Sequence, residues 1–242
     1  MSYLRRNCYF VRHSERADQI DKKQWLSSMP DDPNRNPDDY HNDTTITDHG
    51  VTLAKTVAHT LVTKDIIPNI GDNKVIFASR MRRCVQTAYY IAKELNIPII
   101  LSSGLALTVT AVSRRGVDKF NFWRIADIKQ YCQGVEVING DNYDEIASLP
   151  EGTLPKIALS KASWYEALDS IVLNQYIPSI IVLHSEIIYT LAESDVKPPA
   201  DAPYCCIGDV TFVPGKPGHN GKYDLSELYD YEGTKIFSEY GV

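Results

Sequence analysis

Short apolar runs alternate with stretches of helical periodicity along most of this chain. The apolar runs are bounded by polar residues, as in buried strands, and they predict strands at residues 8–11, 75–78, 97–101, 180–183 and 204–213. Helical spacing of apolar residues predicts helices over residues 47–61, 82–95, 161–174 and 185–193, and Thr47 or Asp48 suits the first N-cap. This alternation predicts an α/β fold with a mainly parallel central sheet and helices on both faces.

The 242 residues fit one large α/β domain or two small ones, and we expect a single domain over residues 1–242. Residues 106–160 show no clean periodicity and many turn signals, so we expect an irregular insertion over the functional edge of the sheet. Residues 18–47 are rich in Pro, Asp and Asn and predict a long surface loop with a short helix near Trp25. The Gly- and Tyr-rich tail at 214–242 is expected to loop back over the surface.

Histidine and arginine side chains follow three of the predicted strands. His13 and its arginine neighbours follow the first strand, Arg83 comes shortly after the second, and His184 follows the strand at 180–183. Because ligands of parallel sheets bind at the carboxyl ends of the strands, we expect these side chains to meet at one edge.

Such a set of residues suits phosphoryl transfer. A neutral imidazole attacks phosphorus and forms a phosphohistidine, and this is the role expected of His13. Guanidinium groups match the charged equatorial oxygens, so Arg12, Arg16 and Arg83 would hold the phosphoryl group without a metal. His184 would donate a hydrogen bond to the same oxygens. This chemistry requires no cofactor.

The composition narrows the range of partners. The net charge of -6 and the pI of 5.5 argue against nonspecific binding to nucleic acid or to an anionic membrane. No apolar run approaches the roughly 20 residues that span a bilayer, and no secretory signal is apparent at the start. The five Cys are odd in number and scattered, which indicates reduced thiols and a cytoplasmic protein. No metal is expected, since the remaining histidines lack metal-ligand spacing: His41, His49, His59 and His219.

Four segments, in the same order, resemble the motifs of the histidine phosphatase superfamily, which has the phosphoglycerate mutase-like fold. Residues 11–16 resemble its Arg-His-Gly-Glu signature, and residues 45–50 resemble its Leu-Thr-x-x-Gly helix start. Residues 78–88 are similar to its Ser-Pro-x-x-Arg-x-x-Gln-Thr-Ala segment, and residues 182–185 to its second-histidine strand. This resemblance implies that His13 is the phosphorylated nucleophile, with the three arginines and His184 around the phosphoryl group.

Some features look most similar to one branch of the superfamily. They are the Arg16-Ala17-Asp18 continuation of the first motif, the long polar loop with Trp25, and the sequence Tyr204-Cys205-Cys206. The branch is the phosphatase domain of the suppressor-of-T-cell-receptor-signalling (ubiquitin-associated and SH3 domain-containing) proteins. By analogy, this resemblance implies a homodimer.

The chain departs from the family pattern at three places. Ser14 and Ser185 stand where Gly is usual, and a hydroxyl at position 14 would either bond to phosphate or narrow the site. The family usually carries a general acid just after the third strand, but residues 104–108 contain no carboxylate. Three other carboxyl groups are candidates for that role: Asp18, Asp118 and Glu186.

The missing acid affects the choice of substrate. A phenolate, whose phenol has a pKa of about 10, leaves without an acid more readily than an alkoxide does. We therefore expect a phosphatase that prefers aryl esters such as phosphotyrosine, in a small molecule or a phosphoprotein. Two alternatives stay open: a phosphoglycerate mutase-type phosphotransferase, and a weak or inactive module that binds phosphate or a phosphopeptide. Turnover of an aryl phosphate excludes the inactive module, and interconversion of phosphoglycerates would identify the mutase.

Overall fold

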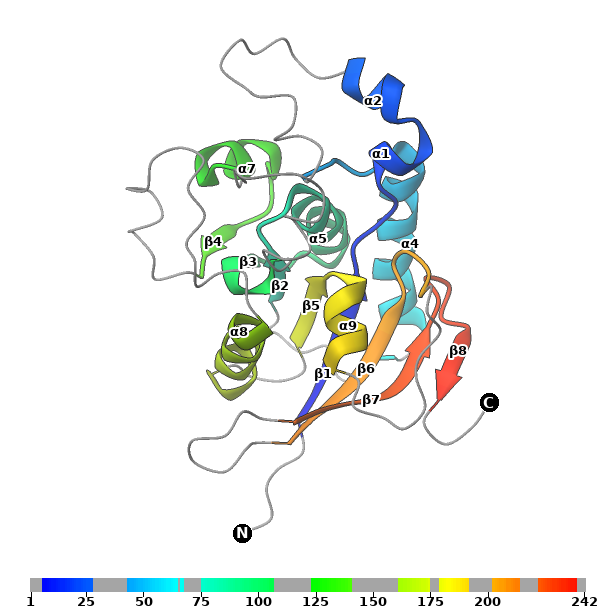
Figure 1. The fold of residues 1–242 in the computed structure, drawn as a ribbon, viewed down its shortest axis with the longest axis vertical. Coiled ribbons are helices and arrows are strands. Elements are labelled where there is room, and N and C mark those ends of the chain that lie inside the picture. Colours follow the sequence, from blue (N-terminus) through cyan, green and yellow to red (C-terminus); the bar gives the residue numbers. More distant parts are fainter. Residues whose placement is uncertain are drawn as a thin grey trace.

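The computed structural model describes residues 6–27, 43–64, 66–67, 75–106, 123–140, 161–174, 179–191, 202–213 and 222–238. Its centre is an eight-stranded sheet with the order β4-β3-β2-β5-β1-β6-β7-β8 (Figure 1). The strands are β1 (Arg6–Arg12), β2 (Ile76–Ser79), β3 (Ile99–Ser102), β4 (Val137–Asn139), β5 (Ser179–Leu183), β6 (Ile207–Val213), β7 (Lys222–Tyr229) and β8 (Lys235–Ser238). The helices are α1 (Ala17–Ile20), α2 (Lys22–Ser27), α4 (Asp48–Thr63), α5 (Arg82–Leu95), η1 (Ser103–Leu105), α7 (Ile125–Tyr131), α8 (Lys161–Asn174) and α9 (Ser185–Leu191).

The expected α/β fold is confirmed, and the sheet is mixed. Strands β4, β3, β2, β5 and β1 pair in parallel, as the alternation of strands and helices predicts. Strands β6, β7 and β8 continue the sheet in antiparallel pairing beyond β1. The three strands that precede His13, Arg83 and His184, namely β1, β2 and β5, therefore all belong to the parallel part of the sheet.

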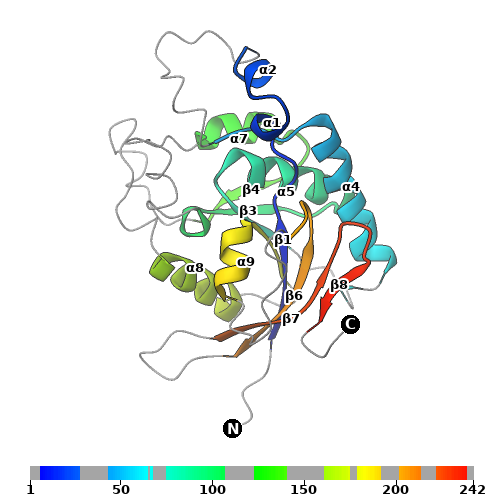
Figure 2. The ribbon, with the colours of Figure 1, turned by 45° about the vertical axis from the view of Figure 1, so that its right-hand side comes forward.

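Helices cover both faces of the sheet (Figure 2). Strand β1 shows how the two faces arise from sequence: Tyr9 and Val11 are buried in one core cluster, and Cys8 and Phe10 in the other. Side chains of a strand alternate between faces, so a continuous apolar run is what a strand covered on both sides requires. Helices α4, α5 and α7 contribute to the first cluster, and α8 and α9 to the second.

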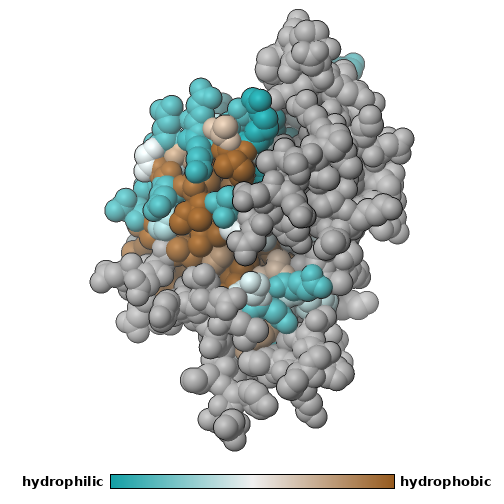
Figure 3. Space-filling model, turned by 90° about the vertical axis from the view of Figure 1, so that its left-hand side faces the viewer, coloured by the Kyte–Doolittle hydropathy of each residue, from teal (hydrophilic) through white to brown (hydrophobic). Residues whose placement is uncertain are grey.

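The insertion at 106–160 was expected to be irregular, and this is wrong for part of it. Among its described residues, α7 forms a helix and β4 extends the parallel sheet beyond β3. Strand β4 is only three residues long and buries one of them, Val137, so its sequence carries no clear strand pattern. Figure 3 shows hydrophobic side chains gathered on the side of the molecule that carries these elements, and Ile138 of β4 is exposed.

The expected surface path of the tail is also wrong where the structure describes it. Strands β7 and β8 form a hairpin that continues the sheet from β6. Tyr223, Leu225 and Leu228 of β7 are buried in the second core cluster, whereas the intervening positions face outward. The clustered tyrosines of this region thus include core residues, as Tyr223 shows.

Helix α4 begins at the predicted capping residue. The Thr47 side chain accepts a hydrogen bond from the Gly50 N–H at 2.8 Å, and its hydroxyl donates to the Glu15 carboxylate at 2.6 Å. One side chain therefore caps the helix and fixes it to the segment that follows β1.

We expect Thr47→Ala to lower the free energy of unfolding by about 1 kcal/mol, the usual effect of losing an N-cap. The conservative Thr47→Ser keeps both hydrogen bonds and serves as the control. Urea denaturation of the three proteins measures the difference. Equal stability of Thr47→Ala and the natural protein would show that the cap contributes nothing.

Candidate active site

The two histidines lie side by side because their strands end level with each other. In the parallel pairing of β1 with β5, Arg12 lies opposite Leu183, so His13 and His184 are the next residues on each strand. The His13 N–H donates to the Leu183 carbonyl at 2.9 Å, which continues the ladder past the last paired residues. The ring centroids are 5.3 Å apart and both side chains are buried.

His13 is held in a form suited to nucleophilic attack. Its Nδ1 lies 2.9 Å from the Ser14 carbonyl, an acceptor only, so Nδ1 carries the ring proton and donates it to this bond. The lone pair is then on Nε2, which makes no hydrogen bond among the described residues. Burial, and next the charge of Arg83, lower the pKa of His13 well below its ordinary value of 6.5, so the ring is neutral.

Residues at the start of α5 and at the end of β2 form hydrogen bonds with the His184 ring. Arg83 donates to His184 Nδ1 at 3.2 Å, so the neutral ring carries its proton on Nε2 and donates to Ser79 Oγ at 3.2 Å. The Cys84 sulfur lies 3.6 Å from His184 Nε2. Both ring nitrogens of His184 are thus engaged by protein groups.

The predicted arginines surround His13. Arg83 is fully buried, and Arg83, Arg12 and Arg16 all act to lower the His13 pKa, because each places positive charge close to the ring. Arg16 also forms two hydrogen bonds to the Asp18 carboxylate, at 3.0 and 2.6 Å. The site is therefore strongly positive inside an acidic protein, as an anion such as phosphate requires.

The segment after His13 is fixed to helix α5. The Ser14 N–H donates to Thr87 Oγ1 at 2.9 Å, and the Ile46 N–H donates to Gln86 Oε1 at 2.9 Å. The Ser14 hydroxyl donates to the Gly50 carbonyl at 2.7 Å. A Cβ at position 50 would meet the Glu15 carbonyl at 3.0 Å and the Ser14 hydroxyl at 3.1 Å, so this close approach favours glycine.

One part of the chain matches a known family in sequence. Residues 8–106 match the family model of the histidine phosphatase superfamily (branch 1). These residues belong to that superfamily.

One known relative matches part of the chain. The chain is 36% identical over 98 residues to the transcription factor tau 55 kDa subunit of Saccharomyces cerevisiae (strain ATCC 204508 / S288c), a match that covers 40% of this chain and 19% of that protein. The chain thus spans only a small part of this relative.

The whole fold has a counterpart among solved structures. The ecdysone phosphate phosphatase from Bombix mori, determined in complex with tungstate, aligns with a TM-score of 0.51 at 18% identity and covers 91% of each chain. This similarity shows that the chain and that protein share a fold. The narrower resemblance to the suppressor-of-T-cell-receptor-signalling branch stays a prediction.

The hydroxyl of Ser14 is bonded within the protein. It is fully buried and donates its proton to the Gly50 carbonyl, so it fixes α4 to the segment after the nucleophile. Ser185 is the first residue of α9 and is half-buried.

The expected general acid is still missing, and the three substitutes differ. Asp18 is engaged by Arg16, Asp118 lies outside the described residues, and Glu186 is half-buried on α9. Within the described part of the chain, Glu186 makes no hydrogen bond or ion pair. Among the described residues, neither Asp18 nor Glu186 forms a hydrogen bond to His13 or His184.

Sequence reasoning missed a buried carboxyl group, Asp43. Its Oδ1 accepts the Arg82 N–H at 2.5 Å, and its Oδ2 lies 3.6 Å from Arg82 Nε. Burial raises the pKa of Asp43 to about 6, although Arg82 and Arg83 act in the opposite direction. No local sequence pattern indicates this contact, since Asp43 lies in a polar segment far from α5.

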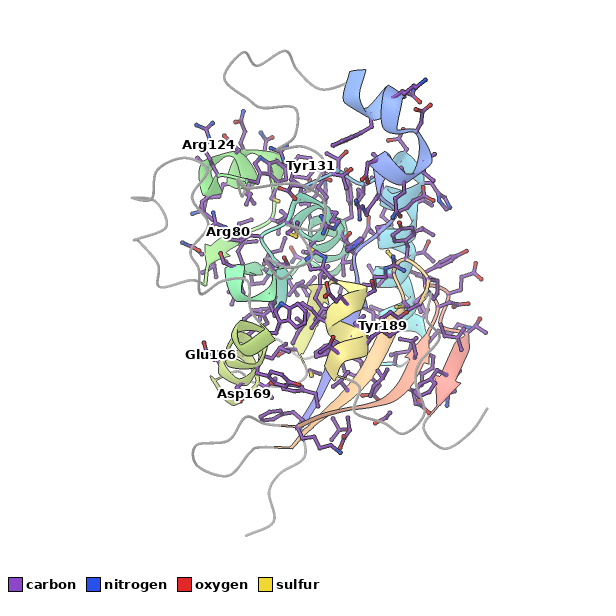
Figure 4. All side chains as sticks on the ribbon, viewed as in Figure 1. Arg80, Arg124, Tyr131, Glu166, Asp169 and Tyr189 are labelled. Atoms are coloured by element: carbon purple, nitrogen blue, oxygen red, sulfur yellow. The ribbon has the colours of Figure 1, made fainter. Side chains whose placement is uncertain are left out.

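Two further residues near the site were not assigned a role. Arg80 is buried, donates to Ser103 Oγ and to the Trp123 carbonyl at 3.4 Å each, and lies near β3 and α7 (Figure 4). Tyr204 stacks against His13, with ring centroids 5.9 Å apart. The only signal for Tyr204 was its place in a segment that resembles one branch of the superfamily.

The described residues meet neither the requirements of a metal site nor those of a membrane-spanning helix. The described residues contain no group of three or more His, Cys, Asp or Glu side chains that could hold a metal ion. No helix in this part of the chain is long and apolar enough to cross a bilayer.

The lowered pKa of His13 predicts that its ring stays neutral at pH 6, because protonation would place a cation beside three arginines in a buried site. The Cε1 proton resonance, assigned by comparison with His13→Asn, is expected not to titrate between about pH 5.5 and 8 around the ordinary value for histidine. In the unfolded chain His13 binds a proton below about pH 6.5, so linkage removes stability as the pH falls through that range. A midpoint near 6.5 for the folded protein would contradict this description of the site.

Proposed function

We propose that this chain hydrolyses phosphomonoesters through a phosphohistidine at His13. The observation that carries the proposal is the neutral His13 ring, with Nδ1 bonded to the Ser14 carbonyl and Nε2 left as the nucleophile among arginines. Membership of residues 8–106 in the histidine phosphatase superfamily supports it.

The reaction has two steps. In the first, His13 Nε2 forms a bond to phosphorus while the bond between phosphorus and the ester oxygen breaks, and the alcohol or phenol leaves. In the second, water attacks phosphorus, the bond to Nε2 breaks, and inorganic phosphate is released. The Arg12 and Arg83 guanidinium groups stabilise the negative charge that spreads over the equatorial oxygens in both transition states. Arg16, freed in part from Asp18, adds to this set.

His184 would have to exchange a partner when phosphate binds. Its Nε2–H donates to Ser79 in the ligand-free state, so a phosphate oxygen must replace the serine hydroxyl as acceptor. The bond from Arg83 to Nδ1 keeps the ring in the correct tautomer for this exchange.

The preferred substrates are aryl esters such as phosphotyrosine, carried by a small molecule or a phosphoprotein. This preference follows from the lack of a carboxylate where the family places its general acid, because a phenolate leaves more easily than an alkoxide. A cytoplasmic location agrees with five cysteines that are all free and buried. A homodimer is proposed by analogy alone.

Hydrolysis of 4-nitrophenyl phosphate in the presence of a metal chelator tests the proposal. We expect turnover by the natural protein, and a loss of at least about 10³-fold in His13→Ala, since the nucleophile is gone. The exposed His59→Ala is the matched control and is expected to keep full activity.

Two results would contradict the proposal. Equal turnover by His13→Ala and His59→Ala would exclude a nucleophilic His13. A natural protein without turnover across about pH 4–8, but with measurable affinity for inorganic phosphate, would instead indicate the non-catalytic binding module.

A further inference from the structure

The segment 202–206 forms one wall of the site. The Arg12 N–H donates to the Cys206 carbonyl at 3.1 Å, and the Arg12 guanidinium donates to the Ala202 carbonyl. The Ala202 N–H in turn donates to the hydroxyl of Tyr189 on α9 (Figure 4). Two hydrogen bonds therefore fix this segment to the end of β1, next to His13, and a third fixes it to α9.

Tyr204 lies at the centre of this wall and touches two groups of the proposed phosphatase site. The Arg12 guanidinium carbon lies 4.3 Å from the centroid of the Tyr204 ring, a cation–π contact. The same ring lies 5.9 Å from the His13 ring. The ring thus contacts both the nucleophile and a phosphate-binding arginine, and it also packs against the first core cluster.

The Tyr204 hydroxyl is buried and has no hydrogen-bond partner among the described residues. Buried hydroxyl groups in folded proteins nearly always have a partner, because an unpaired one loses its bonds to water without replacement. The hydroxyls of three other tyrosines, Tyr89, Tyr131 and Tyr223, each form a hydrogen bond within the protein. A hydroxyl left unpaired beside a nucleophile is therefore expected to pair with the ligand.

We propose that Tyr204 is the proton donor to the leaving oxygen, in place of the missing carboxylic acid. This inference rests on the proposed phosphatase function. As His13 Nε2 bonds to phosphorus, the ester oxygen leaves and takes the proton of the Tyr204 hydroxyl, which becomes a phenolate. In the second step the phenolate takes a proton from the attacking water, so Tyr204 returns to its starting form with the release of phosphate.

The carboxyl groups nearby are less suited to this role. Asp43 accepts the Arg82 N–H and lies against the Arg82 guanidinium, and Asp18 accepts two bonds from Arg16. The two bonds from the Arg16 guanidinium favour the ionised form of Asp18, which has no proton to give. Burial raises the pKa of Asp43 to about 6, but its carboxyl group is directed to Arg82, and no hydrogen bond joins it to either histidine among the described residues. Glu186 forms no hydrogen bond or ion pair with a site residue within the described part of the chain.

Tyr204→Phe removes only the hydroxyl and keeps the ring against Arg12 and His13. The test compares kcat/KM for three esters: 4-nitrophenyl phosphate, phenyl phosphate and phosphoserine. In this order the leaving oxygen becomes more basic, so its departure depends more on a proton donor. We expect Tyr204→Phe to change the first value by less than about 3-fold and to lower the phosphoserine value by about 10² or more, with phenyl phosphate between them. Tyr231→Phe, a tyrosine in the turn between β7 and β8, is the matched control and is expected to match the natural protein on all three esters.

Several results would overturn the inference. Unchanged values for all three esters, or an equal loss for all three, would show that the hydroxyl donates no proton to the leaving group. A selective loss on phosphoserine in Asp43→Asn or Glu186→Gln, with Tyr204→Phe unaffected, would assign the role to that carboxyl group. A natural protein that turns over none of the esters would contradict the proposed function itself, and the inference with it.

Discussion

The parallel pairing of β1 with β5 is the constraint on which the site depends. Because the two strands end level, the residues that follow them lie side by side, and the hydrogen bond from the His13 N–H to the Leu183 carbonyl fixes that position. Helix α5 then begins directly after β2, the next strand, and brings Arg83 to the second histidine. Residues that are far apart in sequence thus meet without any long-range loop, through sheet register alone.

Burial and the positive charge of the arginines around His13 determine the protonation state of its ring, and this charge favours an anion in the site. A buried imidazole close to several guanidinium groups is strongly disfavoured as a cation, so His13 stays a neutral base. The same guanidinium groups lose solvation when they are buried, and an anion in the site restores favourable interactions. Nucleophile and phosphate binding are therefore two consequences of one arrangement: the arginines that suppress protonation of His13 also favour a bound phosphoryl group.

The sequence predicted the parts of the fold that have a strong local pattern. Helices α5 and α8 begin and end at the predicted residues, because their apolar faces repeat over four turns. Strand β4 was not predicted, because its three residues at the edge of the sheet bury only one side chain and show no strand pattern. The hairpin of β7 and β8 was not predicted either, because its buried residues are separated by polar ones within a Gly- and Tyr-rich tail. His13 and His184 were predicted from their positions after strands, whereas Asp43 and Tyr204 belong to segments whose contacts only the folded chain reveals.

The central claim is that His13 carries the phosphoryl group during the reaction. The most direct measurement is a rapid alkaline quench of the protein with an aryl phosphate, followed by intact-mass and fragment-mass analysis. The account predicts a protein species with one added phosphoryl group on His13, and no such species in His13→Ala. A phosphoryl group on another residue, or steady turnover with no phosphorylated protein at any quench time, would contradict it.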